Sequence, residues 1–492
     1  MPVTTLSNAT LGSLRPDVLR PAYDRSAVTP GIVHLGVGAF HRAHQAVFAD
    51  DALGRGESGW GIVAASLRSP DTRDALAPQD GLYSLALRDG EREEVRVIGS
   101  IGSILVAPEA PARLVDALAD PRVKLVTLTV TEKGYLMDLA AGTLLADHPD
   151  IRHDLANPAA PRSAIGFLVE AIARRHAAGV APFTIVSCDN LPSNGATLSA
   201  ALSAFAEARD PALARFIAES VACPSSMVDR IVPATTDADR AAIAARLGVT
   251  DAWPVVGEPY FQWVIEDRFS AERPRYEESG VEFVADVRPF EHMKLRLLNG
   301  SHTVIAAAGR LAGFETVARA FSEPTVRRLV DAYWRDVIPT IETGEAAATA
   351  YTGRLKARYA NSALAHRTAQ IATDASLKVP QRLLAPLREQ LAAGSPAKAL
   401  TFAVALWIRS CGGIDDAGRP FDVTDPALAE WTGRPDQSTA SPEAVVDAFL
   451  GFARVFGSEL PVRPGFRPSL IEAYAAIRAK GVLAAVDETL AA

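Results

Sequence analysis

A change of hydrophobic pattern near Pro289 constrains the fold more than any other feature of the sequence. Before this position short apolar runs alternate with amphipathic stretches, and after it long segments rich in alanine, leucine and arginine predominate. Strands that alternate with helices predict a mostly parallel sheet covered on both faces. The second pattern shows little period-2 alternation and predicts helices. We therefore expect an α/β domain at residues 1–288 and a mostly α-helical domain at residues 289–492.

The same patterns predict the individual elements. Strands are expected at residues 32–35, 61–65, 83–87, 94–98, 123–130 and 183–188. Helices in the first half are expected at residues 43–53, 112–119, 165–178, 196–208 and 237–247. In the second half they are expected at residues 326–337, 345–359, 381–393, 397–409, 444–455 and 468–480.

Composition and charge exclude several classes of protein. With 48% hydrophobic residues the chain can bury a large core, which excludes intrinsic disorder. A net charge of −8 argues against a nucleic-acid partner. The three cysteines are far apart and form no disulfide framework, no basic N-terminal stretch leads into an apolar core, and no apolar run reaches the ~18 residues of a membrane span. These features predict a cytoplasmic protein that does not enter a membrane.

A glycine-rich loop follows the first expected strand. Residues 31–45 read GIVHLGVGAFHRAHQ, so an apolar strand runs into Gly36-x-Gly38 and then into a helix-compatible segment. Gly36 can form the tight turn, and Gly38 lets backbone N–H groups approach a pyrophosphate. The third glycine of the usual fingerprint is replaced by His41. This context favours dinucleotide binding over a purely structural turn.

The residue that reads the cofactor ribose should follow the second strand. Residues 60–71 supply Arg68 and Asp71. An acid there accepts hydrogen bonds from the ribose hydroxyls and repels a 2′-phosphate, whereas an arginine tolerates that phosphate. We expect Asp71 to select NAD, with NADP as the less favoured cofactor. Arg68 is an alternative ribose contact or a solvated loop residue.

The segment from Glu291 to His302 carries the candidate chemistry. On an α-helix the step of about 100° per residue places Glu291, His302 and Asn299 at about 60°, 80° and 140° from Lys294. An acid, an amine, an amide and an imidazole then share one side with apolar residues. Spacing alone leaves a structural set of paired polar groups as an equal alternative.

A second polar cluster, DNLPSNG at residues 189–195, follows the strand expected at 183–188. Polar residues past the carboxyl end of a parallel strand lie where α/β enzymes bind substrates, although an ordinary turn has the same composition. The sequence has no HExxH motif, no Cys/His zinc pattern, no Tyr-x-x-x-Lys pair and no GxSxG elbow. A dehydrogenase of this sequence would therefore need another base, for which Lys294 is the candidate, and we expect no metal.

Several long motifs resemble the polyol-specific long-chain dehydrogenases, which include mannitol 2-dehydrogenase and fructuronate reductase. They are GVGAFHRAHQ, TVTEKGY (129–135), SCDNLPSNG (187–195), MVDRIVP (227–233), WVIEDRF (263–269) and MKLRLLNGSH (293–302). The resemblance implies a Rossmann-type domain followed by a helical domain, with a site in the cleft between them and a small-molecule substrate. It implies a monomer or dimer.

The resemblance also implies roles for individual residues. Lys294 would be the general base, Asn190 and Asn299 would hold the alkoxide, His302 would orient the substrate or the lysine, and Glu291 would relay the proton. Asp229 and Lys378 would contact substrate hydroxyls. The residues implied to contact the dinucleotide, together with the two ribose candidates, are Gly36, Gly38, Phe40, His41, Arg42, Arg68, Asp71 and Glu132.

The substrate is expected to be a sugar alcohol. Motifs such as DNLPSNG favour oxidation of D-mannitol to D-fructose, whereas TEKGY and residues 366–384 are more similar to fructuronate reductases, which act on D-mannonate. Some mannitol dehydrogenases carry an arginine where this chain has Gln370. A uronate carboxylate would need a cation, for which Arg367, Lys378 and Arg382 are candidates. A catalytically silent dinucleotide sensor is the alternative of another class.

Overall fold

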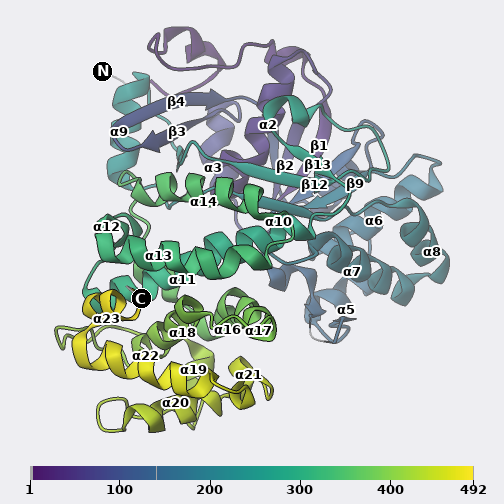
Figure 1. Cartoon of the computed structure of the whole chain (residues 1–492). Helices are drawn as coiled ribbons and strands as arrows, with labels where there is room; N and C mark the ends of the chain where they lie inside the picture. The colour runs from purple at the N-terminus through teal and green to yellow at the C-terminus, as the bar shows by residue number, and fades with distance from the viewer. Residues whose placement is uncertain (1–3, 140, 491–492) are drawn as a thin grey trace. The chain divides into compact units, whose positions relative to one another are not determined.

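A five-stranded parallel sheet organises the first of the two units into which the chain divides, Met1–Arg288 and Pro289–Ala492. The computed structural model describes residues 4–139 and 141–490. The sheet has the order β5-β2-β1-β6-β9, with β1 at Pro30–Leu35, β2 at Gly61–Ser66, β5 at Ile101–Val106, β6 at Leu125–Leu128 and β9 at Thr184–Ser187. Figure 1 labels β1, β2 and β9. All four of its strand pairs are parallel. The strand order reverses between β1 and β6, which creates a crevice at their carboxyl ends.

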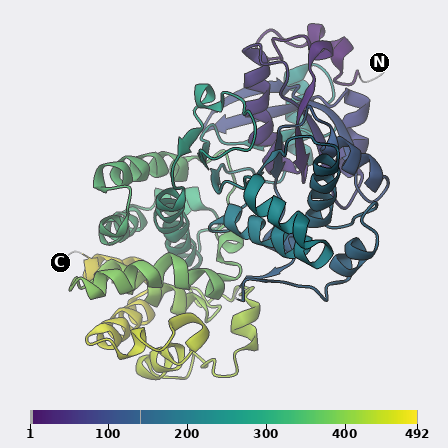
Figure 2. The ribbon, with the colours of Figure 1, turned by 90° about the vertical axis from the view of Figure 1, so that its right-hand side faces the viewer.

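Alternating side chains of the central strands build two cores, one on each face of this sheet. Val33 and Leu35 of β1 join a cluster with the helices α4, α6, α7 and α8, whereas Ile32 joins a second cluster with α2. This two-residue period is what a strand buried on both faces requires. Helices therefore cover the sheet on both sides (Figures 1 and 2), as the sequence predicts.

The helices of the first unit begin with the short α1 directly after the glycine loop. Their bounds are α1 Ala39–Ala43, α2 Gln45–Gly54, α3 Asp71–Leu76, α4 Pro111–Ala119, α5 Pro149–Ala156, α6 Ala164–Ala177, α7 Asn194–Arg209, α8 Pro211–Ser220 and α9 Asp237–Leu247.

Three smaller sheets complete the first unit. The strands β3 (Tyr83–Asp89) and β4 (Arg92–Ile98) form an antiparallel hairpin, and β11 (Val255–Gly257) pairs with β3 in parallel. These three strands form a sheet of their own, separate from the five-stranded parallel sheet. Only two residues connect β3 to β4, and a connection this short permits only antiparallel pairing. The other sheets contain β10 (Ser226–Asp229), β12 (Gln262–Glu266) and β13 (Glu282–Val284), and β7 (Met137–Asp138) with β8 (Thr143–Leu144).

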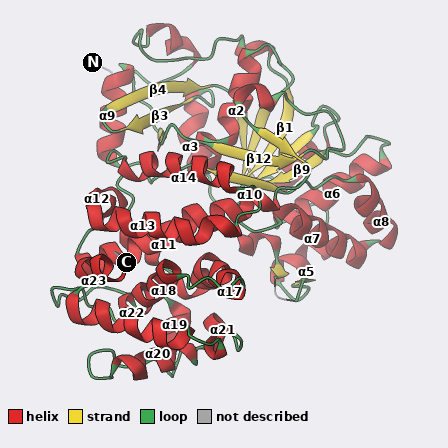
Figure 3. Ribbon diagram, viewed as in Figure 1, coloured by secondary structure: helices red, strands yellow, loops and turns green. Residues whose placement is uncertain are grey.

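The second unit consists of helices, drawn in red in Figure 3. One of them, α18 at Lys398–Ser410, is buried at every position from Ala399 to Ile408. A helix that is apolar on all sides belongs in the middle of a helical core. The other α-helices are α10 Arg288–Met293, α11 Gly300–Ala312, α12 Val317–Ser322, α13 Pro324–Val337, α14 Glu345–Ala360, α15 Thr368–Ala372, α16 Ala375–Val379, α17 Ala385–Ala392, α19 Pro426–Glu430, α20 Pro442–Leu450, α21 Ala453–Phe456, α22 Phe466–Lys480 and α23 Val482–Leu490.

Two π-helical turns interrupt these helices. They are η6 at Lys294–Asn299, between α10 and α11, and η8 at Pro380–Leu384, between α16 and α17. Over the described ranges, no helix has both the length and the apolar character that crossing a lipid bilayer would demand.

Candidate active site

The glycine loop lies at the carboxyl end of β1, beside the switch point of the sheet. Gly36 has φ +101°, and a Cβ at this position would lie 2.8 Å from the Thr129 carbonyl oxygen, so only glycine fits. The Thr129 hydroxyl donates to the Gly36 carbonyl at 2.6 Å, which anchors the turn to the end of β6. Gly38 is exposed and precedes α1. The loop therefore presents its backbone where a pyrophosphate can approach.

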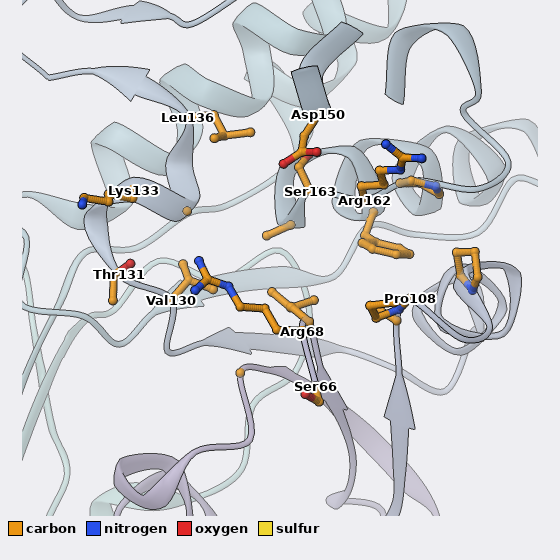
Figure 4. A pocket seen from close by; sticks show the side chains of 18 of the residues that line it. Ser66, Arg68, Pro108, Val130, Thr131, Lys133, Leu136, Asp150, Arg162 and Ser163 are labelled. Carbon is orange, nitrogen blue, oxygen red and sulfur yellow. The ribbon is translucent and has the colours of Figure 1, made fainter. Parts of the chain in front are cut away.

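A cavity of about 1140 Å³ opens at this edge of the first unit. Gly36, Gly38 and Arg68 line it, and Arg68 extends into it (Figure 4). Lys133, directly after Glu132, also lines the cavity, whereas Glu132 and Phe40 are not among its lining residues. Among the described residues, the side chains of Arg68 and Lys133 form no ion pair or hydrogen bond. Two available cations suit a cofactor that carries phosphate groups.

His41 and Arg42 do not line this cavity, because α1 directs them into the core. The His41 ring is fully buried and stacks on His34 with 3.3 Å between ring centroids. The Arg42 guanidinium lies over the Tyr83 ring and donates to the Trp253 carbonyl at 2.5 Å. Both side chains therefore pack inside the first unit, and their contact with the dinucleotide stays a prediction.

The ribose prediction also changes. Asp71 begins α3, accepts a hydrogen bond from the Ser69 hydroxyl at 2.9 Å, and is not among the residues that line the cavity. Arg68, the alternative candidate, does line it. Both Arg68 and Asp71 follow the end of β2, and the sequence therefore predicts either as the ribose contact. The course of the β2–α3 loop decides that Arg68 faces the cavity.

We expect Arg68→Ala to weaken binding of NADP relative to NAD by roughly tenfold, since a charged hydrogen bond contributes about 1.5–3 kcal/mol. Asp71→Ala should leave the ratio of the two affinities within about twofold, because its carboxylate faces Ser69. Calorimetric titration of both variants with each dinucleotide measures this ratio. A rise in NADP affinity in Asp71→Ala, with Arg68→Ala unchanged, would restore Asp71 as the ribose-reading residue.

The buried side-chain amide of Asn194 connects the end of β9 with β10. Asn190 follows β9, and Asp229 ends β10. Asn194, which is fully buried, donates to the Ser226 carbonyl at 2.8 Å and accepts from the Ser226 N–H at 2.9 Å. Its amide also lies 3.3 Å from the Ser187 carbonyl. These bonds hold the carboxyl end of β9 against the first residue of β10, and Asp229 lies three residues further along that strand.

Asp189, the residue before Asn190, belongs to the same arrangement. It accepts a hydrogen bond from the buried Tyr135 hydroxyl, and its other oxygen accepts from the Leu191 N–H at 2.9 Å. Burial raises the pKa of Asp189, against the opposing effect of these hydrogen bonds. Tyr135 is the last residue of the TEKGY motif. The turn that presents Asn190 is therefore fixed from both sides.

Lys294 and Asn299 are the first and last residues of the π-helical turn η6. The Gly300 N–H bonds to the Leu295 carbonyl, five residues earlier, instead of four as in an α-helix. Because a π-helical turn contains more residues than an α-helical turn, residues i and i+5 are separated by a smaller angle around the helix axis. The predicted angle of about 140° between Lys294 and Asn299 is therefore wrong, because it assumed an uninterrupted α-helix. The two residues lie closer to one line than predicted.

Lys294 is buried, with 9% of its surface exposed, and Glu291 on α10 is half-buried. His302 follows on α11 with 7% exposure, and among the described residues its Nε2 has no hydrogen-bond partner. Burial, reinforced by His366 and two arginines, holds the pKa of His302 well below its usual value. The imidazole is therefore neutral, and its Nε2 is buried without a hydrogen-bond partner among the described residues.

Arg382 and Lys378, two of the three candidates for binding a uronate carboxylate, belong to elements that contact α11. Arg382 of η8 donates to the Asn299 carbonyl at 3.4 Å and to the Thr303 hydroxyl at 3.2 Å, and within the described ranges no carboxylate pairs with it. Burial lowers its pKa to about 10. Lys378 donates to the Thr373 carbonyl at 2.5 Å, and burial, with Arg382 nearby, lowers its pKa. Arg367 is exposed.

The parallel sheet, its glycine loop and the cavity beside it place the first unit in the class of Rossmann-type dinucleotide-binding domains. Two family models match the chain, the mannitol dehydrogenase Rossmann domain at residues 30–278 and the mannitol dehydrogenase C-terminal domain at residues 286–478. The chain therefore belongs to the mannitol dehydrogenase family, and the predicted family and fold class are confirmed.

Relatives carry two different names. D-mannonate oxidoreductase of Escherichia coli (strain K12) is 43% identical over 94% of this chain and 96% of that protein. Mannitol 2-dehydrogenase of Aspergillus terreus (strain NIH 2624 / FGSC A1156) is 39% identical over 94% of both chains. The solved ternary complex of Pseudomonas fluorescens mannitol 2-dehydrogenase with NAD and D-mannitol is 37% identical, with a TM-score of 0.84 over 99% of each chain. The family is one of oxidoreductases that act on CH–OH groups, and it supports a nicotinamide dinucleotide cofactor.

Proposed function

We propose that this chain oxidises a secondary hydroxyl of an open-chain sugar derivative to the ketone, and reduces the ketone in reverse, with Lys294 as the general base. The observation that carries the proposal is the π-helical turn that begins at a buried lysine and ends at an amide. His302, which follows this turn, is neutral, and among the described residues its Nε2 has no hydrogen-bond partner. A sensor has no use for a base beside a hydrogen-bond donor.

The dinucleotide fits the first unit through the strained Gly36 turn, the open approach at Gly38 and the cationic side chains of Arg68 and Lys133. When bound, its nicotinamide ring supplies the acceptor for the hydride that leaves the carbinol carbon. We propose NAD as the cofactor, supported by the NAD complex of the structural relative. Asp71 no longer supports this choice, because its carboxylate bonds to Ser69.

The side chains of this chain carry out the proton chemistry. Lys294, which is buried, must be neutral to accept the hydroxyl proton at Nζ. The amide N–H groups of Asn190 and Asn299 donate to the oxygen as it becomes an alkoxide. Glu291 passes the proton from Lys294 onward, and His302 Nε2 bonds to a substrate hydroxyl. Asp229 and Lys378 bind further hydroxyls.

The motifs favour mannitol as the substrate, but the position of Arg382 favours an aldonate such as mannonate. A guanidinium that is largely buried without a carboxylate is costly unless a ligand supplies the charge. Arg382 meets this description, since its hydrogen-bond partners are the Asn299 carbonyl and the Thr303 hydroxyl. The D-mannonate oxidoreductase relative supports the same choice. We therefore propose a six-carbon aldonate and its keto-uronate as the substrate pair, with mannitol and fructose as the second candidate.

A turnover assay on the purified protein, dialysed against a chelator, tests the proposed activity. Nicotinamide reduction is followed by ultraviolet absorbance with a panel of hexitols and aldonates. We expect reduction with at least one of them and no effect of the chelator, since no group of three His, Cys, Asp or Glu side chains in residues 4–139 and 141–490 could hold a metal ion. Turnover that vanishes on chelation and returns with zinc would contradict the metal-free mechanism.

A further inference from the structure

The backbone of the turn η6 is held by an unusual set of side chains. Four consecutive carbonyls, at residues 296–299, each accept a hydrogen bond from a side chain. The donors are Tyr333 to Arg296 at 2.7 Å, Trp334 to Leu297 at 3.1 Å, Tyr359 to Leu298 at 3.2 Å, and Thr303 to Asn299 at 3.0 Å. A π-helical turn disturbs the regular ladder of backbone bonds, and buried carbonyls need other donors.

Tyr333 differs from the other donors because it contacts both π-helical turns. Its hydroxyl lies 2.7 Å from the Arg296 carbonyl in η6 and 3.1 Å from the Arg382 carbonyl in η8, and the two turns pack against each other. The residue is fully buried in α13. Its single hydroxyl hydrogen is therefore shared between the segment that carries Lys294 and the segment that carries Arg382.

Gly300 makes room for this hydroxyl. A Cβ at residue 300 would lie 1.9 Å from the Tyr333 oxygen and 3.1 Å from the Arg382 carbonyl oxygen. Any other residue directly after Asn299 would push Tyr333 away or separate the two turns. The glycine that the sequence pattern treats as an interruption of the helix is thus a requirement of the packing.

We propose that Tyr333 is a positioning residue for catalysis, which sets the π-helical turn that presents Lys294 and Asn299 and holds it in register with Arg382. The inference rests on the proposed roles of Lys294 and Asn299. Tyr333 is fully buried, and its hydroxyl acts through the backbone at Arg296 and Arg382. Displacing a reacting group by about 1 Å can reduce the rate by 10²-fold.

The test compares Tyr333→Phe with the matched variant Tyr474→Phe. Tyr474 is also fully buried in the second unit, and its hydroxyl donates to Gln437 at 3.0 Å, outside both π-helical turns. Each variant removes only a buried tyrosine hydroxyl, which Tyr333 shares between two carbonyls and Tyr474 donates to one amide, so we expect both variants to fold. We expect kcat to fall roughly ten- to a hundredfold in Tyr333→Phe alone, with the dinucleotide affinity of both variants unchanged.

Two further readouts separate positioning from mere stability. In Tyr333→Phe the acid limb of the pH profile of kcat/KM should move to higher pH, because a displaced Lys294 is better hydrated and more easily protonated. Gly300→Ala should also lower kcat, and its effect should be smaller in the Tyr333→Phe background, where the hydroxyl in its way is gone.

Equal kcat in Tyr333→Phe and Tyr474→Phe, with unshifted pH profiles, would overturn this inference. The proposed function would survive that result if Lys294→Met were inactive. Full activity in Lys294→Met would instead refute the proposed function itself.

Discussion

Replacing Lys294 by methionine should lower kcat by about 10²–10⁴-fold, the usual contribution of a general base. Methionine keeps the apolar stem of this buried side chain and removes only the amine, so the fold should persist. The dinucleotide affinity should not change, because the residues that line the cavity assigned to the dinucleotide all belong to the first unit, between Gly36 and Phe167. Steady-state kinetics and a binding titration measure the two quantities.

The matched control is Lys356→Met. Lys356 lies on α14 of the same unit and forms a half-exposed ion pair with Asp331 at 2.8 Å, a contact that contributes little to stability. Its kcat should equal that of the wild type. A Lys294→Met variant with near-normal kcat would require another base.

Replacing Arg382 by alanine should change substrate preference more than overall activity. If Arg382 pairs with a carboxylate, the wild type should use mannonate at least tenfold more efficiently than mannitol, and Arg382→Ala should lose roughly ten- to a hundredfold in kcat/KM on mannonate. Its contacts with Asn299 and Thr303 also support the turn, so a smaller loss on mannitol is expected. The ratio of the two kcat/KM values is therefore the informative quantity.

Arg367→Ala is the control, because this arginine is exposed and its loss should leave the ratio unchanged. Preference for mannitol in the wild type, with equal losses on both substrates in Arg382→Ala, would favour the mannitol assignment that the motifs suggest. Lys294, Asn190 and Asn299 would keep their proposed roles in that case.

Local signals in the sequence predict most of the fold. The helix expected at residues 237–247 has those bounds in the structure, because the Thr236 capping box starts it and Gly248, with φ +82°, ends it. The glycine loop is equally local, since Gly36 must adopt a positive φ. By contrast, the short strands β10, β11 and β13 have three or four residues and no clear alternation, so their sequences do not predict strands.

The candidate site is only partly local, and the π-helical turn shows why. Its residues are compatible with an α-helix, and what stabilises the wider turn are side chains of α13 and α14, more than 30 residues later in the sequence. No periodicity within residues 291–302 can report these contacts. His41 and Arg42 are a second example, since the sequence beside the phosphate loop does not report that both side chains are buried.

Chemical rescue of Lys294→Ala by added alkylamines tests the central claim most directly. Alanine leaves a space where the buried lysine stem lay, and a small amine that enters it can supply the missing base. We expect saturable recovery of substrate oxidation, with a rate that rises with the basicity of the amine among amines of similar size. A folded, dinucleotide-binding Lys294→Ala protein that no amine reactivates, or one that needs no rescue, would contradict the assignment of Lys294 as the base.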